Sequence, residues 1–228
     1  MARSIGEPME IRPTEWQGVY SDGSWLLTRN LNPGVSVYGE SLHLEGGIEY
    51  RRWDVNRSKL AAYLKCGGRV WPYGDATSVL YLGGGNGTTV SHLSDICRQA
   101  TITAIEISPR AFRDLLKVSE ARPNVLPILG DAAKPEMYGN RTNPAAVLYQ
   151  DIAQRDQAAI FRRNLAWLRP GGVGFLMIKA RSEDVAANPV EVYEAAKRDL
   201  MAAGVRILDR RVLAPYQTDH AVLVVKKP

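Results

Sequence analysis

The sequence is poor in cysteine: Cys66 and Cys97 are the only two among 228 residues, and they form no CxxC pair. So few cysteines, without the spacing of metal ligands, exclude a disulfide-stabilised scaffold and argue against a metal site. We therefore expect two free thiols in a reducing compartment and no bound metal.

Long apolar runs are also missing. No stretch approaches the roughly 18 continuous apolar residues that a membrane span needs, and the first residues, MARSIGEPMEIRP, contain no apolar segment typical of a signal peptide. Nor is there a glycine- and arginine-rich or other low-complexity tail. We expect no membrane association and a cytoplasmic location.

The rest of the composition is that of an ordinary globular protein, with 45% apolar and 23% charged residues. The length suits one large domain, or a large domain with a small appendage. The net charge of +5 and the isoelectric point near 9.2 suit a polyanionic partner such as nucleic acid but do not establish one.

The segment TSVLYLGGGNGTT is the strongest local signal. Ser78–Leu82 is short and apolar, which predicts a buried parallel strand, and the glycines after it allow a sharp turn close to a ligand. Thr88 and Thr89 are expected to cap the helix that follows. Such a loop is compatible with a plain strand-to-helix turn, with a dinucleotide site and with a site for S-adenosylmethionine.

Three carboxylates distinguish these ligands. Glu106 ends the next predicted strand, 23 residues after Gly83, where an acid binds the ribose of either ligand. Asp131 and Asp151 follow two further strands, and Asp131 is placed to meet the amine of an adenine. Such an acidic rim repels a pyrophosphate and attracts a sulfonium with a free amino group, so it favours S-adenosylmethionine over a dinucleotide.

The pattern of apolar and polar residues differs between two regions of the chain. Residues 1–55 alternate apolar and polar residues between turns, which predicts a small N-terminal antiparallel β domain that packs on the main domain or meets a partner. Residues 56–228 form the main domain, where strands alternate with helices. We expect an α/β fold with a doubly wound, Rossmann-like, seven-stranded sheet whose last strand is antiparallel, as in S-adenosylmethionine-dependent methyltransferases. The expected strands are 78–82, 101–107, 125–129, 146–150, 173–179, 205–213 and 220–226, and the expected helices are 56–66, 89–98, 109–120, 155–168 and 189–203.

Four polar residues are expected to converge at the carboxyl edge of this sheet. Lys59 lies in the first turn of a helix, Asp151 and Lys179 follow neighbouring strands, and His220 begins the last one. Each lysine alone has a plainer interpretation as a solvated charge. Together, the four suit transfer of a methyl group to an alcohol, in which an ammonium favours the alkoxide and a carboxylate holds the lysine.

The motifs YLGGGNGTTVSHLSDI, AIEISPR, PILGDAAKPEMY, YQDIAQ, IKARSEDV and DHAVLVV, in this order and spacing, closely resemble archaeal fibrillarin. The similar segment VYGESLHLEGGIEYRRWDVNRSKLAA precedes them, so the resemblance covers nearly the whole chain. It implies a methyltransferase that modifies the ribose 2′-oxygen of ribosomal and transfer RNA inside a box C/D ribonucleoprotein. Its implied partners are a box C/D guide RNA with its target RNA, a Nop-domain scaffold protein and a kink-turn-binding ribosomal-type protein.

The resemblance also implies roles for individual residues. Lys59, Asp151, Lys179 and His220 match the family's catalytic cluster. The residues expected to bind S-adenosylmethionine are Gly83, Gly85, Asn86, Thr88, Thr89, Glu106, Ile107, Asp131, Ala132, Asp151 and Gln154. Two of them depart from the family pattern, because Asn86 stands where a serine is common and Ile107 where an aromatic residue packs on the adenine.

Three alternatives remain open at this stage. The first is a methyltransferase that acts on a protein side chain or a small molecule, against which the basic residues Arg51, Arg52, Arg57 and Arg181 argue for RNA. The second is a non-catalytic, RNA-bound structural subunit, which the intact carboxylates disfavour. The third is a dinucleotide-dependent oxidoreductase, for which no hydride-handling site is present.

Overall fold

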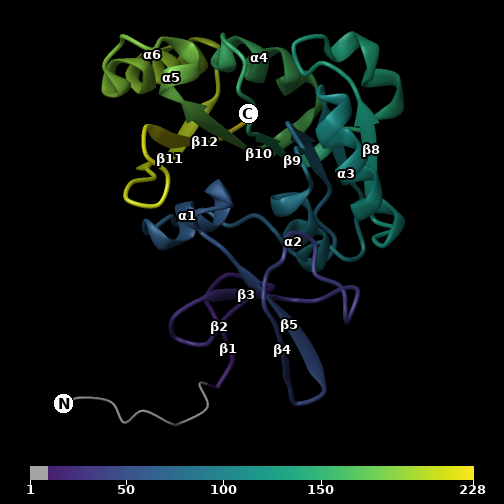
Figure 1. Cartoon of the computed structure of the whole chain (residues 1–228). Coiled ribbons are helices and arrows are strands. Elements are labelled where there is room, and N and C mark those ends of the chain that lie inside the picture. Colours follow the sequence, from purple (N-terminus) through teal and green to yellow (C-terminus); the bar gives the residue numbers. More distant parts are fainter. Residues whose placement is uncertain (1–9) are drawn as a thin grey trace, which may run out of the picture.

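The computed structural model describes residues 10–228, and its N-terminal part is a five-stranded antiparallel sheet in the order β1-β2-β3-β5-β4. In Figure 1 these strands lie apart from the large sheet, with helices α1 and α2 between the two. The predicted N-terminal antiparallel sheet is therefore confirmed over the described residues. The strands are β1 (Arg12–Pro13), β2 (Val19–Ser21), β3 (Leu26–Arg29), β4 (Leu42–Glu45) and β5 (Ile48–Trp53).

The main sheet has seven strands in the order β11-β12-β10-β9-β6-β7-β8. The five strands from β8 to β10 are parallel, whereas β12 pairs antiparallel with both β10 and β11. This confirms the predicted doubly wound sheet and its closing hairpin. Its strands are β6 (Val79–Leu82), β7 (Ile102–Glu106), β8 (Val125–Leu129), β9 (Ala145–Gln150), β10 (Leu168–Lys179), β11 (Arg206–Val212) and β12 (His220–Lys226).

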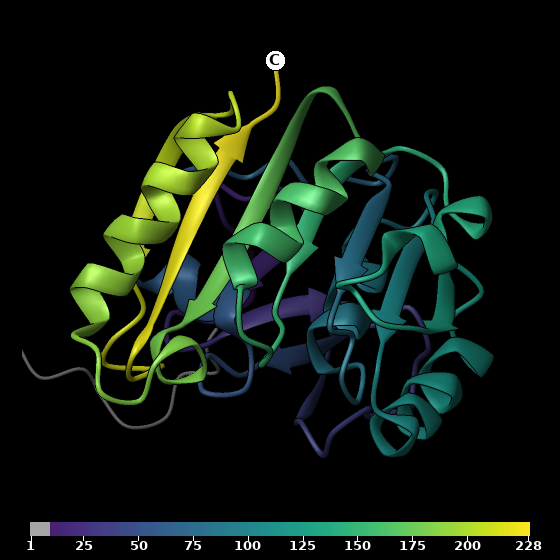
Figure 2. The ribbon, with the colours of Figure 1, turned by 90° about the horizontal axis from the view of Figure 1, so that it is seen from above.

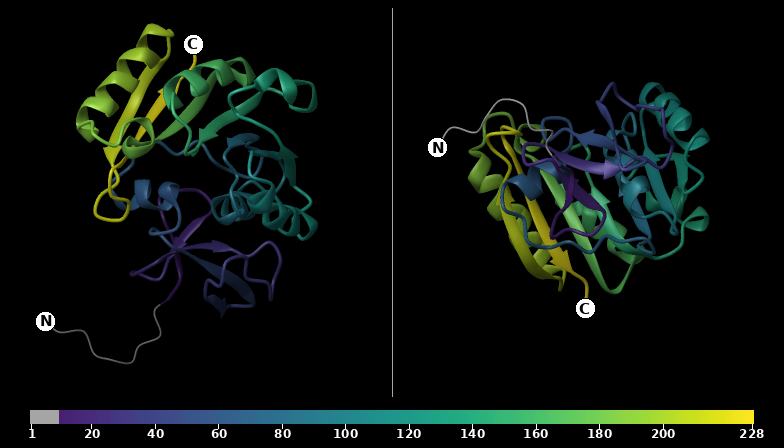
Figure 3. Two further views of the ribbon diagram at one scale, coloured as in Figure 1. Left: turned by 45° about the horizontal axis from the view of Figure 1, so that its top comes forward. Right: turned by 90° about the horizontal axis from the view of Figure 1, so that it is seen from below.

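Helices cover both faces of the main sheet. Figure 2 shows helices α4 and α6 lying over one face, and Figure 3 shows the N-terminal sheet on the opposite side, beyond α1 and α2. Each face has its own apolar core, in which β6 supplies Val79 and Tyr81 to one and Leu80 and Leu82 to the other. The helices are α1 (Lys59–Lys65), α2 (Thr88–Ile96), α3 (Pro109–Glu120), α4 (Gln157–Asn164), α5 (Ala180–Glu183) and α6 (Pro189–Ala202), with short 3-10 turns at Pro135–Met137, Gly139–Arg141 and Leu165–Trp167.

Several predicted boundaries were wrong. Helix α1 begins at Lys59 rather than at residue 56, because Ser58 has extended backbone dihedrals and caps the helix with its side chain. Helix α2 is capped by Gly87, in a left-handed conformation with φ of 84°, so Thr88 is already its first helical residue. Strand β10 extends back to Leu168, across a register shift that interrupts its pairing with β9.

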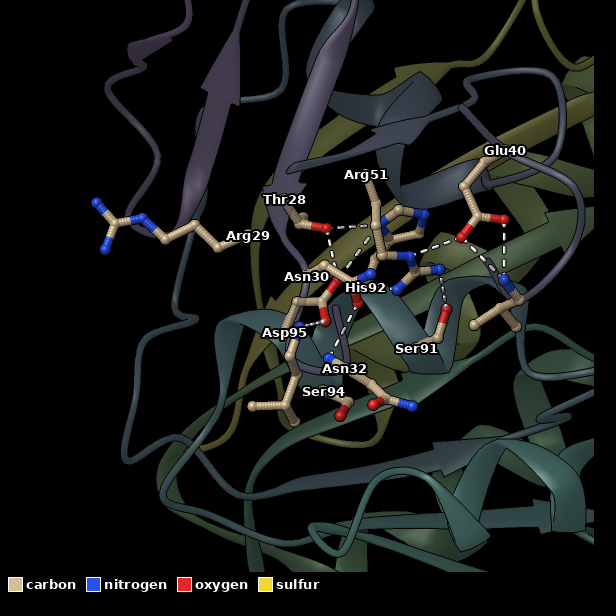
Figure 4. Close-up of polar contacts among 12 residues, drawn as sticks. Thr28, Arg29, Asn30, Asn32, Glu40, Arg51, Ser91, His92, Ser94 and Asp95 are labelled. Atoms are coloured by element: carbon tan, nitrogen blue, oxygen red, sulfur yellow. Dashed lines mark hydrogen bonds and ion pairs between the residues drawn. The ribbon is translucent and has the colours of Figure 1, made fainter. Parts of the chain in front are cut away.

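A buried cluster of charged and polar side chains joins the two sheets (Figure 4). Arg51 of β5 donates from Nε to Glu40 at 2.6 Å and from Nη1 to Asp95 of α2 at 2.8 Å. Arg122 donates to the other oxygen of Asp95 at 2.5 Å. The prediction that Arg51 faces RNA was therefore wrong, because its side chain is 0% exposed and spans the junction of the domains.

His92 of α2 lies in the same cluster. Its Nδ1 is 2.8 Å from the hydroxyl of Thr28, its Nε2 is 2.8 Å from that of Tyr38, and its ring stacks on Trp53. Burial holds the pKa of His92 well below its usual value, and the nearby Arg51 and Arg122 lower it further. When the imidazole is neutral, the positive charges of Arg51 and Arg122 are balanced by the negative charges of Glu40 and Asp95.

The described residues, 10–228, contain no helix long and apolar enough to cross a lipid bilayer. Within the same range, no three histidine, cysteine, aspartate or glutamate side chains lie together as a metal site would require. Cys66 and Cys97 are both free, as predicted.

Candidate active site

The centre of the candidate site is an ion pair between Lys59 and Asp151. The ammonium of Lys59 lies 2.8 Å from Oδ1 and 3.0 Å from Oδ2 of Asp151, so the carboxylate is bound through both oxygens. About one fifth of each side chain is exposed, at 19% and 22%. The pair joins the first residue of α1 to the carboxyl end of β9, which brings together residues far apart in the sequence.

Ser58 fixes the start of α1 from two sides. Its hydroxyl accepts from the backbone N–H of Ala61 at 3.4 Å, as a helix cap does, and from the hydroxyl of Thr89 at 3.0 Å. Thr89 lies in the first turn of α2, directly after the glycine loop. The bond between these two hydroxyls therefore ties the helix that carries Lys59 to the loop predicted to hold the cofactor.

Gly83 allows the loop to pass against the chain at Asp151. It has φ of +83°, and a Cβ at this position would lie 2.2 Å from the carbonyl oxygen of Asp151. The backbone N–H groups of Gly83 and Gly84 both donate to the carbonyl of Ile105. A glycine is required here on two grounds, its backbone conformation and the lack of space.

Glu106 is almost completely buried at the end of β7, with 7% exposed. Its Oε2 accepts from the backbone N–H of Gly85 at 2.7 Å, and its Oε1 accepts from that of Ser108 at 2.7 Å. Each oxygen keeps a second lone pair for a further donor. The carboxylate is thus held beside the loop, with capacity left for the two hydroxyls of a ribose.

Asp131 and Gln154 are directly linked, which the sequence did not predict. The side-chain amide of Gln154 donates to Oδ1 of Asp131 at 3.0 Å, and the backbone N–H of Ala133 donates to the same oxygen at 2.9 Å. The resemblance assigned Asp131 to the adenine and Gln154 to the methionine amine. The structure brings the two side chains into direct contact, and the neighbouring Ala132 is buried with 4% exposed.

Lys179 ends β10 and is paired in register with His220 at the start of β12. Its backbone is held by the side chain of Gln157, which accepts from the Lys179 N–H at 2.9 Å and donates to its carbonyl at 3.1 Å. No hydrogen bond or ion pair within residues 10–228 occupies the ammonium of Lys179. This lysine is therefore fixed at its backbone while its charge stays available.

His220 has charged neighbours on several sides. Its Nδ1 lies 2.6 Å from the carbonyl of Thr218, so this nitrogen carries the proton and Nε2 is left as an acceptor when the ring is neutral. Burial lowers the pKa of His220 below its usual value, and the ammonium of Lys59 lowers it further. Asp151 and Lys179 also act on it electrostatically. The four residues predicted to be catalytic thus lie near one another at the carboxyl edge.

The remaining predicted residues lie around this edge with different exposure. Thr89 is buried with 6% exposed, whereas Ile107 is 51% exposed at the end of β7. Asn86 is exposed on the glycine loop, and Thr88, the first residue of α2, is half-buried. Ile107 therefore presents an exposed apolar side chain at the carboxyl edge of the sheet and does not cover that edge.

The sequence did not single out two residues that position the site. Ser58 fits the general rule for helix caps and could have been found by it, because it directly precedes an apolar helical pattern. Gln157 carries no such signal, since its role depends on where β10 ends relative to α4.

Three of the four predicted basic RNA contacts remain at least partly accessible. The guanidinium of Arg52 lies over the ring of Trp25, at 3.1 Å from its centre, and that of Arg57 lies over Tyr38, at 5.1 Å. Arg181 is exposed and paired with Asp219. Arg51 alone is fully buried.

These residues fit S-adenosylmethionine. Glu106, Asp131 and Asp151 present carboxylates along the carboxyl edge, beside a loop that a Cβ at Gly83 would block. Carboxylates accept from ribose hydroxyls and from exocyclic or α-amines, and they attract a sulfonium. The same set opposes a pyrophosphate, for which no basic side chain lies on the loop.

Comparison with known proteins agrees with this geometry. The family model "Fibrillarin" matches residues 11–228. The "Fibrillarin-like rRNA/tRNA 2'-O-methyltransferase" of Methanothermobacter thermautotrophicus is 44% identical over 211 residues, which cover 92% of this chain and 94% of the relative. Aeropyrum pernix fibrillarin, solved with natively bound S-adenosyl-L-methionine, superposes with a TM-score of 0.88 at 43% identity, covering 97% of this chain and all of the other. A fibrillarin/Nop5p complex matches with a TM-score of 0.85 at 37% identity, over 93% of this chain and 98% of that one. The chain belongs to the fibrillarin family.

Proposed function

We propose that this protein transfers the methyl group of S-adenosylmethionine to the ribose 2′-oxygen of ribosomal and transfer RNA. Nearly full-length similarity to relatives named for this activity supports the proposal. The observation that carries it in this chain is the Lys59–Asp151 ion pair beside the glycine loop, with Lys179 and His220 at the same edge.

The site residues have separable tasks. Bound S-adenosylmethionine supplies an electrophilic methyl group on a positively charged sulfur. Asp151 holds the ammonium of Lys59 through both oxygens, which leaves Lys59 in one orientation at the reacting edge. Lys179, whose ammonium has no partner among residues 10–228, stabilises negative charge on the 2′-oxygen as its proton leaves.

His220 provides the acceptor for that proton. Its Nδ1–H is committed to the carbonyl of Thr218, and its lowered pKa keeps Nε2 unprotonated near neutral pH. Because the ribose hydroxyl is a weak acid, alignment of oxygen and methyl group contributes more than proton transfer does.

The proposed partners follow from the family. We propose that a box C/D guide RNA selects the target nucleotide, that a Nop-domain scaffold protein recruits this chain, and that a kink-turn-binding ribosomal-type protein nucleates the particle. The Nop5p complex of a relative supports the scaffold partner. The named archaeal relatives support a cytoplasmic location for such a particle.

The test is methyl transfer in a reconstituted particle that contains guide RNA, target RNA and both partner proteins. We expect one 2′-O-methyl group at the nucleotide that the guide specifies, detected by blocked alkaline cleavage at that position. Shifting the guide by one nucleotide is the control and should shift the modification equally. Cofactor binding without any transfer to RNA would instead indicate another acceptor, such as a protein side chain.

Replacement of Gly83 by alanine tests the contact between the loop and Asp151. The new Cβ would meet the Asp151 carbonyl at 2.2 Å, so the carboxylate must move. A displacement of about 1 Å can reduce the rate about 100-fold, and we expect a loss of that order in kcat. The measurement is single-turnover methyl transfer in the assembled particle.

Gly204→Ala is the matched control for this variant. Gly204 has the same φ of +83°, but a Cβ there meets nothing within 4 Å. The Gly204→Ala variant should therefore lose about 1–2 kcal/mol of stability through backbone strain alone. Its rate of methyl transfer should be unchanged. Equal rates for the two variants would show that the close approach at Gly83 does not position Asp151.

A further inference from the structure

A cavity lies at the junction of the domains; its lining contains Asn86 and Thr88 of the predicted cofactor set but neither Lys59 nor Asp151. We call it the junction cavity; its volume is about 440 Å³, within the range of ligand pockets. The loop at residues 32–38, the end of the glycine loop and α3 form its walls. Its lining includes Val35, Val37, Val118, Asn86, Arg57 and Lys117.

The loop that forms one wall is fixed in place by two carboxylates. Glu49 accepts from the backbone N–H of Gly34 at 2.8 Å and from the side chain of Asn30 at 2.6 Å. Glu40, which also binds the buried Arg51, accepts from the backbone N–H groups of Val37 and Tyr38. Hydrogen bonds within the protein thus hold this wall of the cavity in place.

The junction cavity adjoins the active site through two short connections. Arg57 lines the cavity and stands two residues before Lys59, while Thr88 lines it and directly precedes Thr89. Ser58 stands between Arg57 and Lys59, and its hydroxyl accepts a hydrogen bond from the hydroxyl of Thr89 at 3.0 Å. Residues that line the cavity are therefore immediate neighbours, along the chain, of residues that hold the Lys59–Asp151 pair in place.

The charges in the cavity suit an anion. The guanidinium of Arg57 lies over the Tyr38 ring and donates weakly to the Tyr38 carbonyl, and no carboxylate within residues 10–228 forms an ion pair with it. Lys117 is paired with Asp114 at 3.0 Å, but its side chain is 73% exposed, so that pair is weak. Arg57 and Lys117 thus remain available to an anion, in a cavity that Asp114 and Arg122 also line.

Other lining residues of the cavity are apolar. Val35, Val37 and Val118 line the cavity, and so does Tyr38, whose ring lies under the Arg57 guanidinium. A ligand that combines a flat, largely apolar body with a negative charge satisfies both parts. Nucleotides have that composition, because every base has a π-face and every phosphate a charge.

We propose that the junction cavity binds one nucleotide of the substrate RNA strand, next to the nucleotide that is methylated. Its phosphate meets Arg57 and Lys117, and its base or sugar lies against Val35 and Tyr38. This assignment rests on the proposed function, since it places a neighbour of the target ribose. The cavity thereby aligns the strand and contributes to KM for RNA.

The experiment measures binding of a single-stranded RNA oligonucleotide to the full chain over a series of salt concentrations. Each phosphate contact contributes about 0.7 to the slope of log K against log salt for single strands. Because both side chains meet one phosphate, we expect the double variant Arg57→Gln/Lys117→Gln to reduce the slope by about 0.7, and each single variant by less. KM for target RNA in the assembled particle should rise, with kcat and cofactor affinity unchanged.

Arg113→Gln is the matched control, because Arg113 is exposed on α3 like Lys117 but does not line the cavity. A slope for the double variant equal to that of this control overturns the proposal. It is also overturned if the double variant keeps the wild-type slope but loses binding to the scaffold protein, since the cavity is then a protein contact. A wild-type particle that transfers no methyl group overturns the proposed function, while a reduced slope in the same preparation still supports the RNA site.

Discussion

Methyl transfer by the Asp151→Asn variant is expected to be slower than that of the wild type by at least about 100-fold at saturating substrates. The carboxylate holds both hydrogen bonds from the Lys59 ammonium, at 2.8 and 3.0 Å. An asparagine offers one acceptor and turns a donor toward the ammonium, so Lys59 loses its fixed position.

The same substitution should weaken cofactor binding. Asp151 is the predicted partner of the methionine amine, and a hydrogen bond between charged groups is worth about 1.5–3 kcal/mol, or roughly 10- to 100-fold in affinity. Calorimetric titration with S-adenosylmethionine measures this effect separately from kcat. Loss in both quantities is expected of Asp151→Asn, because this carboxylate serves the cofactor and the lysine together.

Lys179→Met separates chemistry from binding. This ammonium has no partner among residues 10–228 and is expected to act on the acceptor oxygen alone. We expect kcat to fall by a similar factor while the affinity for S-adenosylmethionine is unchanged. A large loss of cofactor affinity in Lys179→Met would place the lysine at the cofactor and not at the RNA.

Asp156→Asn is the matched control for Asp151→Asn. Asp156 follows the same strand but is exposed, and its φ of 59° is one that asparagine tolerates. Its backbone N–H donates to Glu183, and the substitution leaves that bond in place. Activity of this control should match the wild type, and a comparable loss would contradict a specific role for Asp151.

The sequence predicted the main sheet because its central strands, such as β6 and β7, are short apolar runs. Helix α3 was placed to the residue, since Ser108 caps it and Pro109 opens it. Strand β12 was also correct at both ends, because a short turn precedes it. The apolar pattern of a strand and the capping residues of a helix depend only on residues close together in the sequence. A sequence pattern can therefore predict them.

Contacts between distant segments were not predictable in the same way. Arg51 lies in the motif YRRW next to Arg52, and nothing local shows that the first arginine is buried and the second is not. The burial of Arg51 depends on its hydrogen bonds to Asp95, 44 residues away, and to Glu40. Likewise, the hydrogen bond from Gln154 to Asp131 joins two loops that only the folded sheet brings together.

Asp95→Asn is expected to destabilise the protein by about 3–5 kcal/mol, the usual cost of removing one partner from a buried ion pair. Asp95 accepts from Arg51 at 2.8 Å and from Arg122 at 2.5 Å, and all three side chains are at most 1% exposed. The substitution leaves two buried guanidinium groups with Glu40 as their remaining carboxylate. Since domains have about 5–15 kcal/mol of stability in all, the loss should be plain in urea unfolding.

Asp199→Asn makes the same chemical change in an exposed ion pair and serves as its control. Arg162 and Asp199 are 49% and 34% exposed, so breaking their pair should cost less than about 1 kcal/mol. Similar unfolding free energies for the two variants would show that the buried cluster adds nothing beyond a surface pair.

The cluster should also influence the cofactor without touching it. Asp95 lies near the end of α2, and the same helix begins at Thr88, directly after the glycine loop. Arg51 joins α2 to the N-terminal sheet at two points, through Asp95 and through the hydroxyl of Ser91. Loosening this attachment lets the start of α2 move relative to Ser58 and Lys59. We therefore expect Asp95→Asn, at temperatures where it is still folded, to bind S-adenosylmethionine more weakly than Asp199→Asn does. Equal affinities would mean that the bond between Ser58 and Thr89 alone fixes the loop, and that the N-terminal sheet stabilises the fold without shaping the site.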